Sequence, residues 1–345
     1  MKTLTATLAL AVGLITAQAR AEDYPKMNLK LAHFGPATFV QSGVDKWWAE
    51  EIERRSDGKI RIRIFWAGAA GGALEILGLV GSGAIDFGAT PQAFYPNELP
   101  LTGAPNAVPM VFTDNRTAVA IQSELIAAVP AVQDELKRNN VRPLFFHSLN
   151  SYAPLCTRPV ATMDNLSGLR IRSFGVFQPA LFDAIGAVGV NVLPADIYEG
   201  LQRGRLDCGF YSNDLYRSTK LYEVAKHLMS VDFGPSSTWP IWVSEKKWSN
   251  EWPESVRTLI SEVSREAEAR SLAEVKRVSS ESLDFIMSQG VKVVEFRETD
   301  KLRAAVPDML EVWRSNMIQR GLGSEADQVL AFWRPRQEEL ERARR

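Results

Sequence analysis

The side chains that most often carry catalysis are few and scattered in this sequence. Its histidines, His33, His147 and His227, lie far apart, and none belongs to an HExxH segment. No CxxC, Walker or GxSxG motif occurs. Residues 81–88 match GxGxxG only loosely, and they precede an expected strand, whereas the dinucleotide-binding motif follows one. With no cluster of metal ligands and no motif for a base or a nucleophile, the sequence favours binding over catalysis.

Arg172 is the side chain whose position best suits the recognition of a ligand. It closes the run Leu-Arg-Ile-Arg at 169–172, which predicts a short strand with the arginine at its end. The planar guanidinium can hold a carboxylate through two parallel, charge-assisted hydrogen bonds. The alternative is an arginine at a strand end that pairs with a surface acid. On spacing alone, both interpretations stay open.

Two sets of alternating strands and helices are expected to position this arginine. The first set has strands at 27–33, 60–66 and 84–89, with helices around 44–52 and 74–81. The second set has strands at 169–172, 189–193 and 206–210, with a helix in each interval. Each βαβαβ set forms a small parallel sheet whose strand ends face a cleft.

Further elements connect the two sets. Strands are expected at 144–147, 154–158 and 239–244. Residues 254–289 carry apolar side chains at helical spacing after Pro253, and Gly290 ends the pattern. Such a helix is roughly 54 Å long, so we expect a spine that touches both lobes. A strand at 291–296 and helices at 301–320 and 325–341 follow, the last ending in a solvated charge run.

The composition and the N-terminus indicate an exported globular protein. The chain has 345 residues, of which 46% are hydrophobic and 23% charged, as in an average globular protein. A formal net charge of −1 gives no support for nucleic-acid binding. Residues 1–21 are typical of a signal peptide, with Lys2, an apolar stretch and a cleavage site at Ala19-Arg20-Ala21. We therefore expect a periplasmic protein that is not itself inserted in the membrane.

The two cysteines, Cys156 and Cys208, each lie in an apolar, strand-like run. Because free cysteine behaves as a small hydrophobic residue, we expect two separate buried thiols. A disulfide is the alternative, since the expected compartment permits one. No histidine has an evident link to either cysteine, so a catalytic thiol is not expected.

Residues 166–226 resemble the signature of the periplasmic solute-binding subunits of TRAP transporters, the DctP-like family. The run Leu-Ser-Gly-Leu-Arg-Ile-Arg at 166–172 is similar to the family's L-K-G-L-K-I-R, whose arginine holds a substrate carboxylate. Further similar segments extend the resemblance over most of the chain, at 30–33, 71–75, 83–86, 108–114 and 242–248. The resemblance implies an α/β fold of the two-lobed periplasmic binding protein class (type II-like). Its two βαβ-built lobes are joined by crossing strands and a long spine helix.

This organisation divides the chain into lobes. We expect lobe I at 22–148, with part of 235–285 returning to it. Lobe II is expected at 149–234, with 290–345 packing on it. The spine helix at 254–289 runs across both.

Three positions depart from the pattern of the family that the chain resembles. Tyr152 stands where sialic-acid-type members carry a second arginine, Tyr211 where many carry asparagine, and Thr90 where some carry glutamate. The pocket is therefore expected to be less charged and more aromatic. The expected ligand-binding residues are Arg172, Tyr152, Tyr211, Phe174, Thr90, Gln92, His33, Trp239, Asn150 and Trp66.

The first functional hypothesis is a periplasmic protein that binds an organic acid, preferably a monocarboxylate, between its lobes. Hinge closure then traps the ligand, and by resemblance the closed form delivers it to the TRAP membrane permease. No cofactor and no metal are expected. The alternatives are a secreted enzyme acting in the same cleft, and a binding protein that presents its ligand to a sensor receptor. The last of these uses the same clamp, so the sequence does not separate it from the first.

Overall fold

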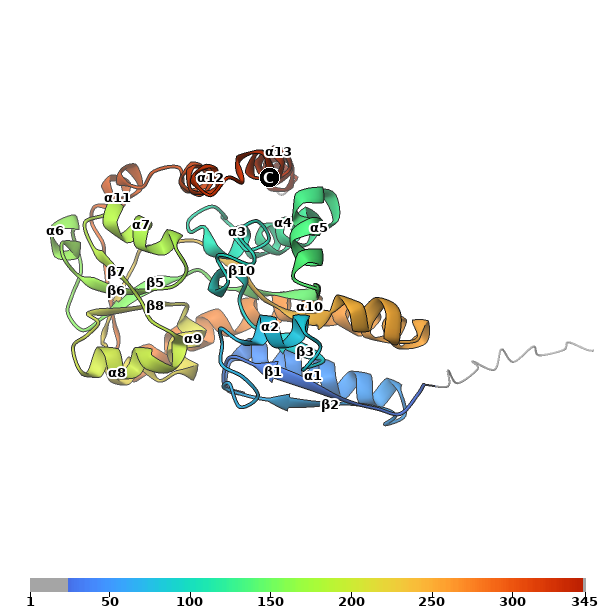
Figure 1. The fold of residues 1–345 in the computed structure, drawn as a ribbon. Coiled ribbons are helices and arrows are strands. Elements are labelled where there is room, and N and C mark those ends of the chain that lie inside the picture. The colour runs from blue at the N-terminus through green and yellow to red at the C-terminus, as the bar shows by residue number, and fades with distance from the viewer. Residues whose placement is uncertain (1–23, 344–345) are drawn as a thin grey trace, which may run out of the picture.

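The computed structural model describes residues 24–343 and shows two lobes, each built on its own β-sheet (Figure 1). Lobe I holds a five-stranded sheet in the order β2-β1-β3-β10-β4. Its strands are β1 (Met27–His33), β2 (Ile60–Phe65), β3 (Phe87–Ala89), β4 (Val141–Leu149) and β10 (Ser236–Ser244). Its helices are α1 (Val40–Arg55), α2 (Ile76–Gly81), α3 (Ala104–Ala107), α4 (Asn115–Ala128) and α5 (Pro130–Arg138).

The predicted parallel unit forms the start of lobe I. β1 pairs in parallel with β2 on one side and with β3 on the other. β3 is shorter than the predicted strand at 84–89 because residues 84–86 form bends instead of extended backbone. β10 then enters the sheet from a distant part of the chain. It runs antiparallel to both β3 and β4, and so it lies between them.

Lobe II holds a six-stranded sheet in the order β11-β9-β5-β8-β6-β7. Its strands are β5 (Ala153–Cys156), β6 (Arg170–Ser173), β7 (Val188–Asn191), β8 (Cys208–Tyr211), β9 (His227–Met229) and β11 (Lys292–Val294). Its helices are α6 (Met163–Leu166), α7 (Phe177–Ala184), α8 (Ile197–Gln202) and α9 (Asn213–Ser218). β6 pairs in parallel with β7 and β8, as expected for the second βαβαβ set.

The long helix α10 (Glu254–Ser288) joins the two lobes. Its 35 residues extend over about 52 Å. It packs on α1 and β4 of lobe I and on α9 of lobe II, so the predicted spine is confirmed. In lobe I, the Trp48 indole donates a hydrogen bond to Ser264 Oγ at 3.0 Å. At the junction of the lobes, Asn150 Nδ2 donates to the carbonyl of Val275 at 2.9 Å.

The C-terminal segment differs from the prediction in two ways. A single helix was expected at 301–320, but Pro307 separates α11 (Thr299–Ala305) from α12 (Met309–Gln319). Proline disfavours helical backbone in the residue before it, and Asp308 then caps the new helix.

The expectation that 290–345 packs on lobe II is also wrong for its last part. β11 does join the lobe II sheet, but α13 (Gly323–Arg342) lies along α4 and α5 of lobe I (Figure 1). The Arg336 guanidinium pairs there with Glu124, at 2.6 Å.

The two cysteines form a disulfide, so the expectation of two separate thiols is wrong. β5 and β8 run antiparallel with Cys156 directly opposite Cys208, and their Cα atoms are 4.0 Å apart. This pairing depends on which strands are neighbours, and strands 52 residues apart in sequence need not be.

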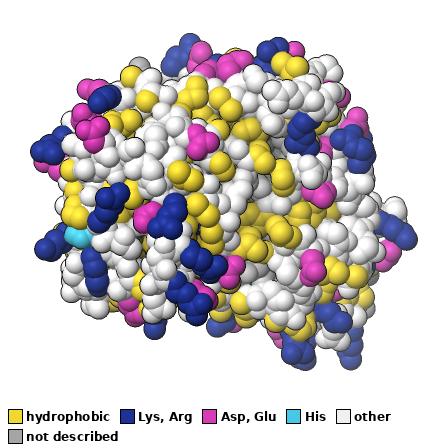
Figure 2. Space-filling view, turned by 60° about the vertical axis from the view of Figure 1, so that its left-hand side comes forward, with side chains coloured by type: hydrophobic (Ala, Val, Ile, Leu, Met, Phe, Trp, Pro, Cys, Tyr) yellow, Lys and Arg dark blue, Asp and Glu magenta, His cyan; other side chains and the backbone are white. Residues whose placement is uncertain are grey.

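The predicted signal peptide at 1–21 lies outside the described residues. From residue 24 to residue 343, no helix is both long and apolar enough to cross a membrane. Figure 2 shows one face of the molecule, where hydrophobic side chains gather along the middle and charges of both signs lie scattered around them.

Candidate ligand-binding site

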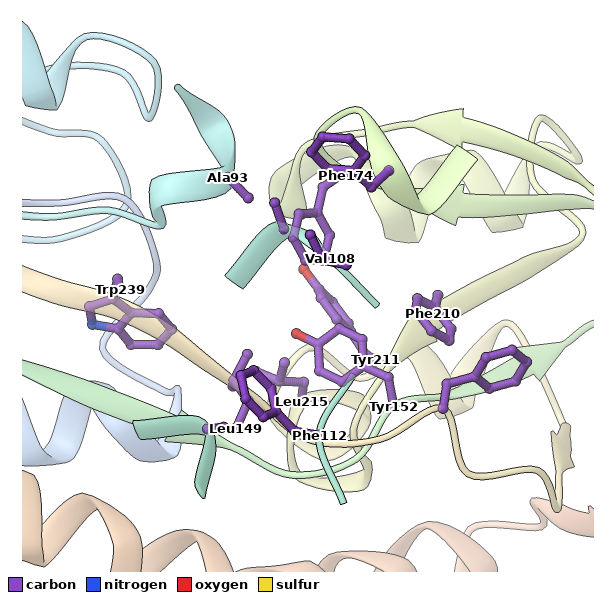
Figure 3. Close-up of a cluster of buried hydrophobic side chains, with 14 of the residues drawn as sticks. Ala93, Val108, Phe112, Leu149, Tyr152, Phe174, Phe210, Tyr211, Leu215 and Trp239 are labelled. Atoms are coloured by element: carbon purple, nitrogen blue, oxygen red, sulfur yellow. The ribbon is translucent and has the colours of Figure 1, made fainter. Parts of the chain in front are cut away.

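A small cavity lies between the two lobes. The lining residues from lobe I are Phe34, Phe39, Pro91, Phe94, Asn106, Leu149, Thr238 and Trp239, and those from lobe II are Tyr152, Arg172, Phe174, Pro194, Tyr211 and Leu215. Its volume is about 30 Å³, which is room for roughly two water molecules. The lobes therefore stand close together in this structure, and Figure 3 shows Trp239 facing Tyr152 and Tyr211 across the gap.

Arg172 supplies the charge of this cavity. It lies on β6, and only 1% of its surface is exposed. Its Nε donates to the carbonyl of Val192 at 3.2 Å, and Nη1 makes a longer 3.5 Å contact with the carbonyl of Phe210. The guanidinium also lies over the rings of Phe174 and Tyr211, 4.8 and 4.6 Å from their centres.

The buried guanidinium has no acidic partner. No Asp or Glu between residues 24 and 343 makes an ion pair with it, although buried charges in proteins are normally paired. Arg170, two residues earlier on β6, does pair with an acid, because both its Nε and Nη2 donate to Asp207 outside the cavity, at 2.9 and 3.0 Å. The alternative interpretation of Arg172, an arginine that pairs with a surface acid, thus describes Arg170 instead. Arg172 offers an uncompensated positive charge to an anionic ligand.

Two phenols stand beside the arginine. The rings of Tyr152 and Tyr211 meet edge to face with their centres 5.8 Å apart. Burial raises the pKa of both, although Arg172 acts in the opposite direction. Both phenols are therefore neutral hydroxyl groups, which can donate to or accept from a ligand.

The lobe I side of the cavity is largely aromatic. The ring of Trp239 meets Phe34 edge to face at 4.8 Å. Phe94 of lobe I meets Phe174 of lobe II at 6.3 Å, so aromatic contact also joins the lobes. Such a wall favours an apolar or planar ligand body.

The structure brings together about half of the predicted site. Arg172, Tyr152, Tyr211, Phe174 and Trp239 line the cavity. His33 and Trp66 do not, because His33 is buried behind Trp239 with its Nε2 3.0 Å from Asp45. Trp66 packs on His33, with 4.6 Å between ring centres.

Thr90 and Gln92 are also turned away from the cavity. The Thr90 hydroxyl donates to the carbonyl of Ala73 at 3.1 Å and accepts from the Tyr95 hydroxyl at 3.2 Å. Gln92, in the short helix Gln92–Phe94, is buried, and neither of its side-chain polar atoms has a hydrogen-bond partner among the described residues. It borders a second space of only about 10 Å³, which Val176 and other residues enclose.

Asn150, the remaining predicted residue, joins the lobes behind the cavity. Its Nδ2 donates to Asp214 Oδ1 on α9 at 3.0 Å, besides its bond to α10. Burial raises the pKa of Asp214, while the hydrogen bond from Asn150 acts against that rise.

Replacing Asp214 with asparagine should make stability less dependent on pH. A carboxyl group whose pKa is raised by folding takes up a proton when the chain folds. The free energy of unfolding therefore falls as pH rises above the unfolded-state pKa of about 4 and through the higher folded-state pKa. Asp214→Asn keeps an oxygen for Asn150 but cannot ionise. Urea unfolding at several pH values should show the variant gaining stability relative to the wild type as pH rises.

The exposed Asp134 on α5 provides the control for this comparison. Asp134→Asn should follow the wild-type pH profile. A constant difference between Asp214→Asn and the wild type at all pH values would contradict the prediction.

Several lining residues were not predicted from the sequence. Phe34 and Pro91 follow the ends of β1 and β3, and Leu149 ends β4. The rule that ligands bind at the carboxyl ends of strands would therefore have identified them. Asn106 lies on α3, where no local signal marks it. Its Oδ1 accepts from the backbone N–H of Ala93 at 3.1 Å. No group of side chains suited to a metal ion occurs within residues 24–343.

The chain is similar in sequence to two periplasmic proteins whose ligands are named. The chain is 23% identical to the 2,3-diketo-L-gulonate-binding periplasmic protein of Escherichia coli, over 96% of this chain and 98% of that protein. It is 22% identical to a monocarboxylate 2-oxoacid-binding periplasmic protein of Nostoc, over 78% of this chain and 73% of that protein.

A solved structure has the same fold. An extracytoplasmic solute receptor of Bordetella pertussis that binds pyroglutamic acid superimposes with a TM-score of 0.77, covering 89% of this chain and 99% of the receptor at 16% identity. The model of the bacterial extracellular solute-binding protein family 7 matches residues 31–319. The predicted resemblance to TRAP solute-binding subunits is therefore confirmed, and the chain belongs to bacterial extracellular solute-binding protein family 7.

Proposed function

We propose that this protein is the periplasmic solute-binding subunit of a TRAP transporter and that its ligand is a small monocarboxylate. The observation that carries the proposal is Arg172, a buried charge without an acidic partner, at the wall of a cavity between two lobes. A ligand carboxylate supplies the missing negative charge through two hydrogen bonds. The similar proteins from Nostoc and Bordetella pertussis bind a 2-oxoacid and pyroglutamic acid, and both ligands carry one carboxylate.

The rest of the cavity supports a receptor rather than an enzyme. Its lining residues include no Asp, Glu, His, Cys or Lys, which are the usual bases and nucleophiles. Contacts to a ligand from both lobes shift the population toward the closed form. The closed form then docks on the membrane permease, as the family assignment implies.

A competition experiment tests the ligand class. Beyond Arg172, the polar side chains in the wall are two phenols, Asn106 and Thr238. A second carboxylate or a polyhydroxylated tail therefore loses water without gaining enough partners, at roughly 1–3 kcal/mol for each unpaired group. We expect pyroglutamate or a short 2-oxoacid to bind at least about tenfold more tightly than succinate or sialic acid.

The measurement is calorimetric competition on ligand-stripped protein, after a thermal-shift screen of organic acids has selected the best monocarboxylate. Equal affinity for succinate would refute the monocarboxylate preference, and equal affinity for sialic acid would refute the expected penalty on a polyhydroxylated tail. Absence of any organic acid from the stabilising compounds would refute the proposed function itself.

A further inference from the structure

A buried polar network lies directly behind the Trp239 wall of the cavity. Its centre is Asp45 on α1, which has no exposed surface. Side chains from three different strands approach its carboxylate: His33 Nε2 at 3.0 Å and the Trp239 indole N–H at 3.2 Å reach Oδ2, and His147 Nε2 lies 3.0 Å from Oδ1. A fully buried carboxylate is costly unless it is paired in this way.

Neighbours contact both ring nitrogens of His33. Its Nδ1 lies 2.9 Å from the backbone nitrogen of Gly35 and 3.0 Å from the carbonyl oxygen of the same residue. Its Nε2 lies 3.0 Å from Asp45 Oδ2. The ring is therefore fixed in position beside the Asp45 carboxylate.

His147 meets acceptors through both of its ring nitrogens. Its Nδ1 lies 2.9 Å from the backbone carbonyl of Trp239, and its Nε2 faces Asp45. The contact with Asp45 is a close approach rather than a well-aligned hydrogen bond. Burial alone would raise the pKa of Asp45, but His147 and then His33 outweigh that effect and hold it at about 2.

Trp239 is consequently held at two points. Its indole N–H donates to Asp45, and its own carbonyl accepts from His147, which is paired with the same Asp45. Trp239 is 98% buried between this network and the cavity, and its ring forms the wall opposite the phenols of Tyr152 and Tyr211 (Figure 3).

We propose that Asp45 is a positioning residue for ligand binding, which fixes the Trp239 indole as the wall that contacts the ligand's body. This inference rests on the proposed function. Asp45 does not itself line the cavity, so its effect is transmitted through Trp239. The carboxylate of the ligand is left to Arg172. Loss of Asp45 therefore weakens the recognition of the ligand's body and leaves the recognition of its carboxylate intact.

The test uses Asp45→Asn with two probes, pyroglutamate and acetate. Acetate reaches Arg172 but has almost no body to place on the wall. We expect the affinity for pyroglutamate to fall by about tenfold and the affinity for acetate to change by less than about twofold. Glu50→Gln is the matched control, because Glu50 is an exposed acid on the same helix that pairs with Lys46. It should change neither affinity.

A second readout requires no ligand. In protein labelled with 5-fluorotryptophan, the ¹⁹F resonance of Trp239 is assigned from its loss in Trp239→Phe. Asp45→Asn should shift or broaden that resonance, whereas Glu50→Gln should not. Trp239→Phe also keeps a ring in the wall while removing the indole N–H, so adding Asp45→Asn to it should lower the pyroglutamate affinity no further.

An unmoved Trp239 resonance would overturn the inference, and so would equal losses for pyroglutamate and acetate. If Asp45→Asn does not fold, Trp239→Phe tests the inference by itself. An unchanged ratio of pyroglutamate to acetate affinity in that variant would contradict the role of the Trp239 indole in binding the ligand's body. If the resonance moves but the wild type binds no organic acid, the proposed function fails while the control of Asp45 over Trp239 stands.

Discussion

Arg172→Ala is expected to weaken ligand binding by roughly 30-fold to several thousand-fold. Truncating one partner of a buried, hydrogen-bonded charge pair typically costs about 2–5 kcal/mol. The upper part of that range is plausible here because no other cationic side chain lines the cavity. Without the guanidinium, the carboxylate of the ligand would be buried against carbonyls and aromatic rings. Isothermal titration calorimetry with the best monocarboxylate measures the loss.

Two further variants test whether the guanidinium group itself, rather than a positive charge or any arginine on β6, is needed for binding. Arg172→Lys keeps a positive charge but loses the planar fork, so it should still bind more weakly than the wild type. Arg170→Ala removes an arginine from the same strand whose partner, Asp207, lies outside the cavity, and its affinity should be unchanged. Unaltered binding by Arg172→Ala would remove the central observation behind the proposed function.

Loss of the disulfide should cost the folded protein about 4 kcal/mol. The bridge closes a loop of 52 residues, and constraining a loop of that length in the unfolded chain stabilises the native state by about this amount. The double variant Cys156→Ala, Cys208→Ala should therefore unfold at a clearly lower urea concentration than the oxidised wild type. Both cysteines pair in the middle of the lobe II sheet and do not line the cavity, so ligand affinity should be largely kept.

Reduction provides the control for this prediction. With a strong reductant present, the wild type should unfold near the midpoint of the double variant, and the variant should not respond. Coincident midpoints for the oxidised wild type and the variant would show that the bridge contributes nothing to stability.

Local patterns in the sequence predict the parts of the fold that depend on neighbouring residues. The period-two alternation of β2 and the helical spacing of α10 are local, and both elements were predicted close to their observed bounds. Arg172 could also be predicted as a site residue, because the end of a parallel strand faces the cleft. The aromatic character of the site followed from Tyr152 and Tyr211, which both line the cavity.

Features that depend on distant packing were not predictable in this way. Thr90 follows a strand end as the rule requires, but the Tyr95 hydroxyl and the carbonyl of Ala73 hold its side chain away from the cavity. His33 lies at the end of β1, yet Asp45 draws its ring behind the wall. The disulfide has the same origin, since only the pairing of β5 with β8 brings the cysteines together.

The position of β10 determines the order in which the protein can fold. β10 fills the middle of the lobe I sheet, and Trp242 on it donates to the carbonyl of Thr90, 152 residues earlier. Until residues 236–244 have been synthesised, β3 has no strand on one side and β4 has no partner strand at all. Every strand of lobe II except β11 is by then already present. α13 reaches α4 later still, across 212 residues between Arg336 and Glu124. Contacts of such long range make folding slow. Lobe I thus begins the chain but completes its fold last.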